Sequence, residues 1–325
     1  MASKLDSLVV QAREGGDEIR LCGALVARAA EAVKDRRPDA AIADLGEAAK
    51  LHEASGRHLD ASHCACQAAT VARLGGDLDG AIELAERAAA LAGDDAAYRC
   101  YALVEHAEVL LLARDPRGAA KWLTEARAVA EDTEADLRIG IAMKHAEALL
   151  MVGELDSAEA VWKTVAQEAK DTEALAEVLI RRATLLCEAV PGIAPGAVLR
   201  AKGVAIEAGQ ARQLADVALL EATLAISADE LDVAIAAAKK ARALALECEG
   251  AMVYASAAAI IARLCERKGD RQGAYDSLAL GIETLAKLLD DELARATFEP
   301  LLSELRDRWG ETEFAAVQEF AKQMQ

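Results

Sequence analysis

Residues 145–158, HAEALLMVGELDSA, decide the fold of this chain. An apolar helical segment runs up to Val152, Gly153 ends it, and the acid Glu154 precedes a second segment that contains Ala158. Glycine is favoured just past a helix end, and a carboxylate at the start of the next helix caps free N–H groups. The stretch therefore predicts two helices joined by a tight turn.

The same turn recurs along most of the chain. It reads Gly, acid, two further residues, a small residue and Ala at residues 76–81, 153–158 and 269–274, and looser copies lie between these, 37 to 40 residues apart. A second column about twelve residues upstream is also alanine in every copy, and a third, seven residues downstream, is small or β-branched. Because 78 of the 325 residues are alanine, one all-alanine column of seven has a chance of roughly 10⁻⁴ to 10⁻⁵, so two such columns establish a repeat. The columns are Ala41, Ala81, Ala119, Ala158, Ala197, Ala234 and Ala274; Ala29, Ala69, Ala107, Ala146, Ala183, Ala222 and Ala262; and Ala48, Ala88, Ala126, Val165, Val204, Ala241 and Gly281.

Composition supports helices throughout. Aromatic residues make up only 3% of the chain, there are 5 prolines, and alanine and leucine dominate, which disfavours strands. Small residues in the columns allow two antiparallel helices to approach closely. One pair cannot bury its apolar face alone, so neighbouring pairs are expected to stack into a solenoid.

The repeat resembles the tetratricopeptide repeat (TPR) family, in which small residues occupy these three columns and a Gly-acid turn joins the helices. The resemblance covers residues 17–289 and implies a right-handed superhelical solenoid of antiparallel helix pairs. The period is near 39 instead of the usual value of about 34, which looks like the longer subclass of bacterial signalling and regulator domains. The family's large first-helix aromatics are mostly replaced, for example by Leu103 and Ala142.

Three segments are predicted. Residues 1–16 form an N-terminal capping helix, starting at Ser3, and residues 17–289 form seven TPR-like helix pairs. Residues 290–325 form a C-terminal capping pair, whose large side chains favour sealing of the last repeat over docking. A turn rich in Pro and Gly at residues 190–196 is about two residues longer than the others, which indicates a local bend more than a domain boundary. The aromatic residues of the capping pair are Phe298, Trp309, Phe314 and Phe320.

Charge and targeting patterns limit the function classes. The chain has 55 acids against 37 bases, a formal charge of −18, which disfavours nucleic-acid and membrane-surface partners. The sequence contains no apolar run of 18 residues and no basic, apolar leader. Its seven cysteines are odd in number and irregularly spaced, which suits a reducing compartment. We therefore expect a cytoplasmic protein.

No catalytic or cofactor motif is found, and we expect neither an enzyme nor a cofactor. The cluster of His63, Cys64 and Cys66 offers zinc-type ligands, but on a helix only His63 and Cys66 share a face, so buried thiols are favoured over a metal site. His106 and His145 lie at equivalent places in adjacent repeats, which indicates duplication.

The resemblance to TPR proteins also implies a concave surface lined by the first helix of each pair. At two inner positions, Glu108 and Glu147 stand where the family's carboxylate clamp has Lys and Asn, so a ligand with basic residues is favoured over a carboxylate tail. An apolar stripe beside these acids would suit an amphipathic or extended segment, although the same residues could equally be core between helices. The candidate binding residues are Tyr101, Val104, Glu108, Leu111, Met143, Glu147, Leu150, Ile180, Thr184, Leu219 and Thr223.

The repeat pattern and the charge distribution favour two functions. The leading one is a non-catalytic TPR-like scaffold or adaptor that binds a protein or peptide segment on its concave surface. The alternative is a sensor or regulatory repeat protein that binds a small molecule or short peptide inside the superhelix.

Overall fold

A computed structural model describes residues 4–324, and nearly all of them are helical. The described residues contain no strand, which confirms the all-α class. The chain divides into two compact units between Glu168 and Ala169. The N-terminal unit contains α1 (Lys4–Glu14), α2 (Glu18–Lys34), α3 (Pro38–Ala54), α4 (His58–Gly75), α5 (Leu78–Ala92), α6 (Ala96–Leu112), α7 (Pro116–Val129), the 3-10 helix η1 (Ala130–Asp132), α8 (Ala135–Val152) and α9 (Leu155–Glu168). The C-terminal unit contains α10 (Thr172–Ala189), α11 (Ala194–Ala208), α12 (Ala211–Ser227), α13 (Leu231–Glu247), α14 (Ala251–Arg267), α15 (Arg271–Leu288), α16 (Asp291–Trp309) and α17 (Glu311–Met324).

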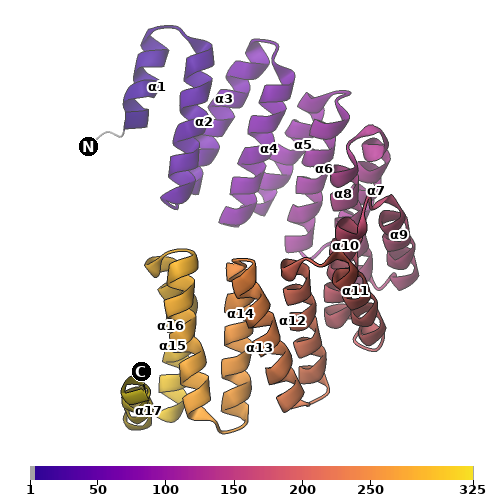
Figure 1. Cartoon of the computed structure of the whole chain (residues 1–325). Coiled ribbons are helices and arrows are strands. Elements are labelled where there is room, and N and C mark those ends of the chain that lie inside the picture. Colours follow the sequence, from indigo (N-terminus) through magenta and orange to yellow (C-terminus); the bar gives the residue numbers. More distant parts are fainter. Residues whose placement is uncertain (1–3, 325) are drawn as a thin grey trace. The chain divides into compact units, whose positions relative to one another are not determined.

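Successive helices pack as antiparallel neighbours within each unit (Figure 1). Pairs α2–α3, α4–α5, α6–α7 and α8–α9 stack in the N-terminal unit, after α1. Pairs α10–α11, α12–α13 and α14–α15 stack in the C-terminal unit, before α16 and α17. The predicted start of the first helix at Ser3 lies outside the described residues.

The alanine columns form the contacts between helices. Every residue of the first two columns is buried, and so is every residue of the third except Val204, which is half-buried. A larger side chain at these positions would have to push two helices apart, because protein interiors leave few voids. The small residues of the repeat therefore set the spacing of the helices.

The glycine just before the first alanine column in three of the turns is required by the cap of the helix that follows. Asp77 accepts a hydrogen bond from the backbone N–H of Gly80 at 3.1 Å and so caps α5. A Cβ atom added to Gly80 would lie only 2.3 Å from the Asp77 Oδ2 atom. Gly153, with φ of 87°, ends α8 in the left-handed region that favours glycine. The same capping arrangement pairs Asp115 with Gly118 and Asp270 with Gly273.

In each of the first three pairs, a side chain of the first helix donates a hydrogen bond to the second helix. The Ser62 hydroxyl donates to the Ala88 carbonyl at 2.8 Å. Thiols donate at the equivalent positions, from Cys22 to Ala48 at 3.9 Å and from Cys100 to Ala126 at 3.4 Å. Each bond joins a first helix to the third column of its own pair. Two of the scattered cysteines therefore replace a serine in a repeated structural role.

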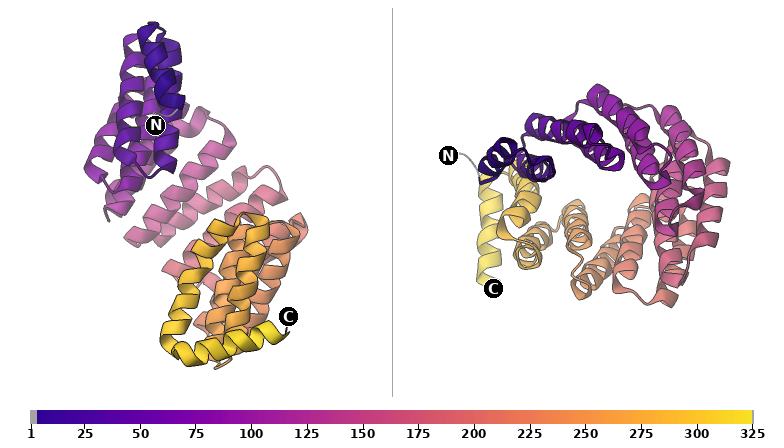
Figure 2. Two further views of the ribbon diagram at one scale, coloured as in Figure 1. Left: turned by 90° about the vertical axis from the view of Figure 1, so that its left-hand side faces the viewer. Right: turned by 90° about the horizontal axis from the view of Figure 1, so that it is seen from above.

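The aromatic residues of the last two helices mostly fill the core. Phe298 and Phe314 are buried, whereas Phe320 is exposed. A Cβ atom added to Gly281 would lie 2.9 Å from Phe298, so this ring covers the small residue of the third column. The indole N–H of Trp309 donates to Glu266 at 3.2 Å. The left view of Figure 2 shows α17 turning sharply away from the axis of α16, so only part of its surface packs against the repeats.

The longer turn is confirmed inside the fifth pair. Four residues separate α10 from α11, where other pairs have two or three. The break between the two compact units does not fall at this turn but before α10, at Glu168 and Ala169. The alanine columns gave no sign of that break, because they continue in register on both sides of it.

Candidate functional site

One face of α6 carries four of the predicted binding residues. Tyr101, Val104, Glu108 and Leu111 follow one another at helical spacing, so they lie on the same side of the helix. Tyr101 is 52% exposed and the other three are half-buried. Elsewhere on α6, Cys100, Leu103, Ala107 and Val109 are all buried. Within the described N-terminal unit, this face is the accessible side of a central helix.

Ion pairs connect this face to the neighbouring first helices. Arg73 of α4 donates two hydrogen bonds to Glu105, at 2.5 and 3.3 Å, and lies 3.5 Å from the Glu108 carboxylate. Lys144 of α8 forms an ion pair with the same Glu108. Bonding to Glu105 raises the pKa of Arg73 further above its already high value. Three successive first helices thus share one network of alternating charge.

Sequence reasoning placed Glu108 on this surface but did not predict its partners Arg73 and Lys144, or the neighbouring Glu105 that also binds Arg73. Part of the signal for this pairing was present in the sequence, because the oppositely charged Arg73 and Glu105 are 32 residues apart, a little less than one full repeat. The pairing depends on how far each first helix is rotated and shifted against the next, and the alanine columns do not specify this. Glu108 is therefore balanced by two cations of the chain itself.

The predicted residues on α8 are less accessible. Met143 and Leu150 are buried, and Glu147 is half-buried. The structure therefore places Met143 and Leu150 in the core between helices, the alternative that the sequence pattern left open. Side chains that are already packed gain little from contact with a ligand.

The C-terminal unit holds the other four predicted residues. Ile180 is buried, Leu219 is half-buried, Thr184 is exposed and Thr223 is half-buried. Each threonine hydroxyl donates to the carbonyl four residues earlier, Thr184 to Ile180 and Thr223 to Leu219, both at 3.0 Å. Thr70 of the N-terminal unit does the same with Cys66 at 3.1 Å. These three threonine hydroxyls are thus bonded to their own helices.

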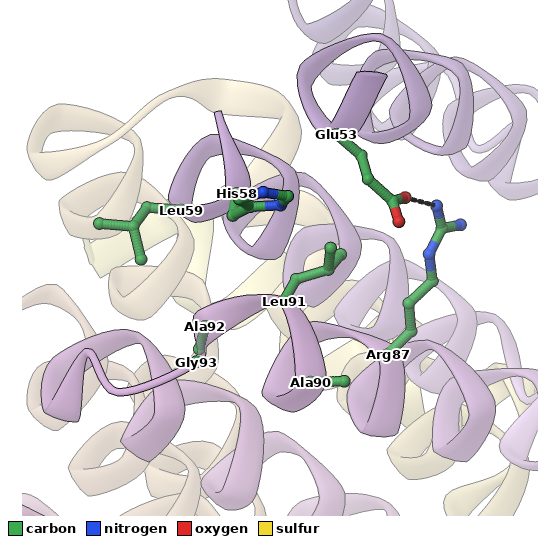
Figure 3. Close-up of a pocket in the computed structure, with 8 residues that line it drawn as sticks. All are labelled: Glu53, His58, Leu59, Arg87, Ala90, Leu91, Ala92 and Gly93. Carbon is green, nitrogen blue, oxygen red and sulfur yellow. Dashed lines mark hydrogen bonds and ion pairs between the residues drawn. The ribbon is translucent and has the colours of Figure 1, made fainter. Parts of the chain in front are cut away.

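A surface cavity of about 540 Å³ opens at another edge of the N-terminal unit (Figure 3). Its rim carries an ion pair of 2.7 Å between Glu53 of α3 and Arg87 of α5. His58 and Leu59, at the start of α4, and Leu91 complete the lining with Ala90, Ala92 and Gly93. None of the predicted binding residues lines this cavity.

The cysteines and histidines form no cluster that could hold a metal ion in the described part of the chain. No group of three or more His, Cys, Asp or Glu side chains is placed to hold a metal ion there. All seven cysteines are free thiols. Burial raises the pKa of Cys64, Cys66 and Cys100 to about 11, so these thiols stay protonated near neutral pH.

The two repeated histidines lie on either side of α7. His106 stacks on Trp122 with 4.2 Å between ring centroids. His145 is 7% exposed and lies 3.2 Å from the Thr124 hydroxyl and 3.3 Å from Arg127. Burial, and then the charge of Arg127, lowers the pKa of His145 to about 4 against a smaller opposing effect of Glu154. Burial also lowers the pKa of His106, so both rings are neutral at pH 7.

Sequence comparison finds no match to a family model or to a curated protein. Solved structures do match in fold. The apo form of RapI matches over 85% of this chain and 98% of its own, with a TM-score of 0.52 and 11% identity. A Rap protein complexed with Competence and Sporulation Factor covers 83% of this chain and 76% of its own, with a TM-score of 0.47 and 16% identity. The TPR-like repeats described for a Podosopora anserina kinesin light chain cover 57% and 94%, with a TM-score of 0.48 and 14% identity.

The match to RapI, the regular period and the stacked helix pairs together define the fold as an all-α repeat solenoid. The fold of the chain is similar to that of TPR-like repeat proteins. At 11% identity this likeness concerns the fold alone. Among the described residues, no helix is both long enough and apolar enough to cross a membrane.

Proposed function

We propose that this chain is a non-catalytic TPR-like scaffold that binds a protein or peptide segment along its first helices, with α6 at the centre of the contact. The observation that carries the proposal is this face of α6, where Tyr101 is exposed and Val104, Glu108 and Leu111 are half-buried. An exposed tyrosine next to apolar side chains and a charged group is typical of interface anchors.

The ion-pair network suggests how a basic ligand would bind. Lys144 is 41% exposed at its side chain, so it can leave Glu108 at little cost. A Lys or Arg of the ligand would then take its place, and the half-buried Glu108 would stay paired throughout. Arg73, which is more deeply buried beside Glu105, would hold the carboxylate in position during the exchange.

Photo-crosslinking tests the location of the contact. Benzoylphenylalanine replaces Tyr101 in one chain and Glu83, an exposed residue of the second helix α5, in a control chain. After irradiation in lysate of the source organism, we expect a discrete adduct from position 101 and not from position 83. Equal adducts from both positions, or none from position 101, would exclude α6 as the binding surface.

A charge-neutral variant tests the role of the network. The double change Glu108→Gln and Lys144→Gln removes one charge of each sign, so the net charge is unchanged. We expect the adduct formed at position 101 to decrease and to lose its sensitivity to salt. The matched double change Glu83→Gln and Lys121→Gln, at exposed positions on second helices, should leave the adduct unchanged. The same yield from both double variants would contradict the preference for a basic ligand.

A further inference from the structure

A second cavity of the N-terminal unit lies where α8 packs against both α7 and α9 (Figure 1). Its volume is about 340 Å³, at the lower end of the range for ligand sites, which favours a small ligand. None of the predicted binding residues lines it. The apolar part of its lining includes the buried residues Ala130, Ala142 and Val165. The charged part consists of Arg127, Glu131, Arg138 and Glu168.

Two of these four charged groups are satisfied by the chain itself. Arg138 donates from Nε to the Glu168 carboxylate at 3.2 Å, and a second N–H group of the same side chain bonds to the Thr133 carbonyl. A ligand would have to compete with these bonds. The charges that remain for a ligand are therefore Arg127 and Glu131.

The guanidinium of Arg127 is held in place but has no counter-ion. Arg127 is half-buried, and its Nη1 atom lies 3.3 Å from the Nδ1 atom of His145. Because a guanidinium only donates, Nδ1 is the acceptor, and the proton of the neutral ring is on Nε2, which lies 3.2 Å from the Thr124 hydroxyl. This bond uses one of the five N–H groups of Arg127. Among residues 4–324, no carboxylate lies within ion-pair distance of this guanidinium.

Glu131 is the unpaired acid of the same cavity. It follows Arg127 by four residues, about one helical turn further along α7 and η1. Its side chain is exposed, and it pairs with no cation in the part of the chain that the structure describes. The cavity thus presents one cation and one anion, each without a counter-ion, next to an apolar surface. A ligand complementary to this lining carries both charges beside an apolar group.

We propose that this cavity binds a free α-amino acid with an aliphatic side chain. The carboxylate of the ligand accepts hydrogen bonds from Arg127, and its ammonium group faces Glu131. The aliphatic side chain contacts Ala130, Ala142 and Val165, whose apolar surface it shields from water. An anion without the ammonium group leaves Glu131 unpaired, and a cation without the carboxylate leaves Arg127 unpaired. This site is separate from the α6 face, and either assignment can fail without the other.

Calorimetric titration of the full chain tests the class of ligand. The probes are alanine, valine and leucine, which share both charges and differ in the size of the apolar group. For the amino acid that binds best, the amide removes the carboxylate and the deaminated acid removes the ammonium group. We expect saturable binding of at least one amino acid, with a Kd of about 1 mM or tighter, and clearly weaker binding of both analogues. Binding of none of the three amino acids, or an analogue that binds as tightly, would overturn the proposal.

Variants locate the ligand. Arg127→Gln and Glu131→Gln should each weaken binding by about tenfold, because each removes one charge-assisted hydrogen bond. Arg117→Gln is the matched control, since Arg117 is an exposed cation of α7 that does not line the cavity. Glu131 is exposed, so its variant tests the site even if the Arg127 variant disturbs folding, which circular dichroism would reveal. Equal affinity of the Glu131 variant and the control would contradict the assignment.

The histidine ring next to Arg127 reports on the contact independently. The ring signal of His145 in a proton–carbon correlation NMR spectrum should shift with the same saturation curve as the calorimetric titration. His58, which lines the other cavity, should not shift. A shift of His58 without one of His145 would place the amino acid in the other cavity, and the proposal would be wrong.

Discussion

Arg28 holds the carboxylate of Asp44 with two hydrogen bonds, from Nε at 2.8 Å and from Nη2 at 2.7 Å. The same guanidinium reaches Asp6 at 3.2 Å, so it joins α2 to both α3 and α1. Asp44 is buried although it carries a charge. A bidentate, largely buried pair of this kind is sensitive to the loss of one partner, because the other charge is left without compensation.

Replacing Asp44 by Ala should therefore destabilise the N-terminal unit by about 2 to 3 kcal/mol. The loss should be local, because each repeat contacts mainly its neighbours. Hydrogen exchange followed by mass spectrometry should show faster exchange in α1 to α3 and unchanged exchange in α14 and α15. The control Asp35→Ala breaks an exposed pair with Arg37 and should have little effect. Uniformly faster exchange across both units would contradict the quasi-one-dimensional behaviour of a solenoid.

The buried histidines predict acid sensitivity of the N-terminal unit. The folded-state pKa of His145 is about 4, well below the value near 6.5 that an unfolded chain would show, so the unfolded state binds the proton more readily. Stability should be fully present above pH 6.5 and fall as the pH drops towards 4, by about 2 kcal/mol from this group between pH 7 and pH 5. Denaturant titrations at both pH values measure the difference.

Replacing His145 by Gln provides the control for this effect. Gln can still hydrogen-bond Thr124 and Arg127 but cannot be protonated, so the drop in stability below pH 6.5 should become smaller. The lowered pKa of His106 acts in the same direction, so part of the drop should remain. An unchanged pH dependence in the variant would show that His145 is not responsible.

The hydrogen bond from Ser62 to Ala88 predicts which substitutions of Ser62 preserve the stability of the fold. Ser62→Ala should cost about 1 kcal/mol, since it removes a buried donor. Ser62→Cys should be close to neutral, because Cys22 and Cys100 already fill the equivalent positions. Thermal unfolding of the two variants, read against the parent chain, distinguishes them. If both variants lose the same stability, the thiol bonds do not substitute for the hydroxyl bond.

The alanine columns predict the cost of overpacking. Ala146 is fully buried between helices, so Ala146→Leu should cost about 1 to 3 kcal/mol and loosen α8 and its neighbours first. Ala128→Leu, at an exposed position of α7, adds the same atoms without a clash and should be nearly neutral. Equal stability of the two variants would mean that the column does not set the helix spacing.

The raised pKa values of the buried thiols predict slow alkylation of the folded chain. Cys64, Cys66 and Cys100 should react slowly with iodoacetamide near neutral pH in the folded chain, since the thiolate is the reactive form. In denaturant the same residues should react quickly, and peptide mass mapping identifies each one. Rapid alkylation of Cys100 in the folded chain would contradict its burial.

Much of the fold could be predicted from the sequence because the constraints are local and repeated. Ala81 and its equivalents show where helices meet, and the turn around Gly80 shows where each pair reverses. These positions depend on backbone geometry within one pair. The all-α class and the order of the helix pairs therefore followed from the spacing of small residues.

The candidate site was less predictable because it depends on register between pairs. Val104 and Met143 are equivalent positions of neighbouring repeats, yet the first is half-buried and the second is buried. The pairing of Glu108 with Lys144 likewise depends on the rotation of α8 against α6. A period in the sequence fixes which residues are equivalent, but not how much of each the next helix covers.

The hydrogen bonds of Thr184 and Thr223 have a consequence for any ligand of the C-terminal unit. Because Thr184 and Thr223 donate their hydroxyl hydrogen bonds to the carbonyls of Ile180 and Leu219, each hydroxyl oxygen keeps lone pairs that can still accept a hydrogen bond. At these two positions of the C-terminal unit the hydroxyls are therefore acceptors. A ligand that contacts these hydroxyls has to supply hydrogen-bond donors, such as backbone amides, side-chain amides or ammonium groups.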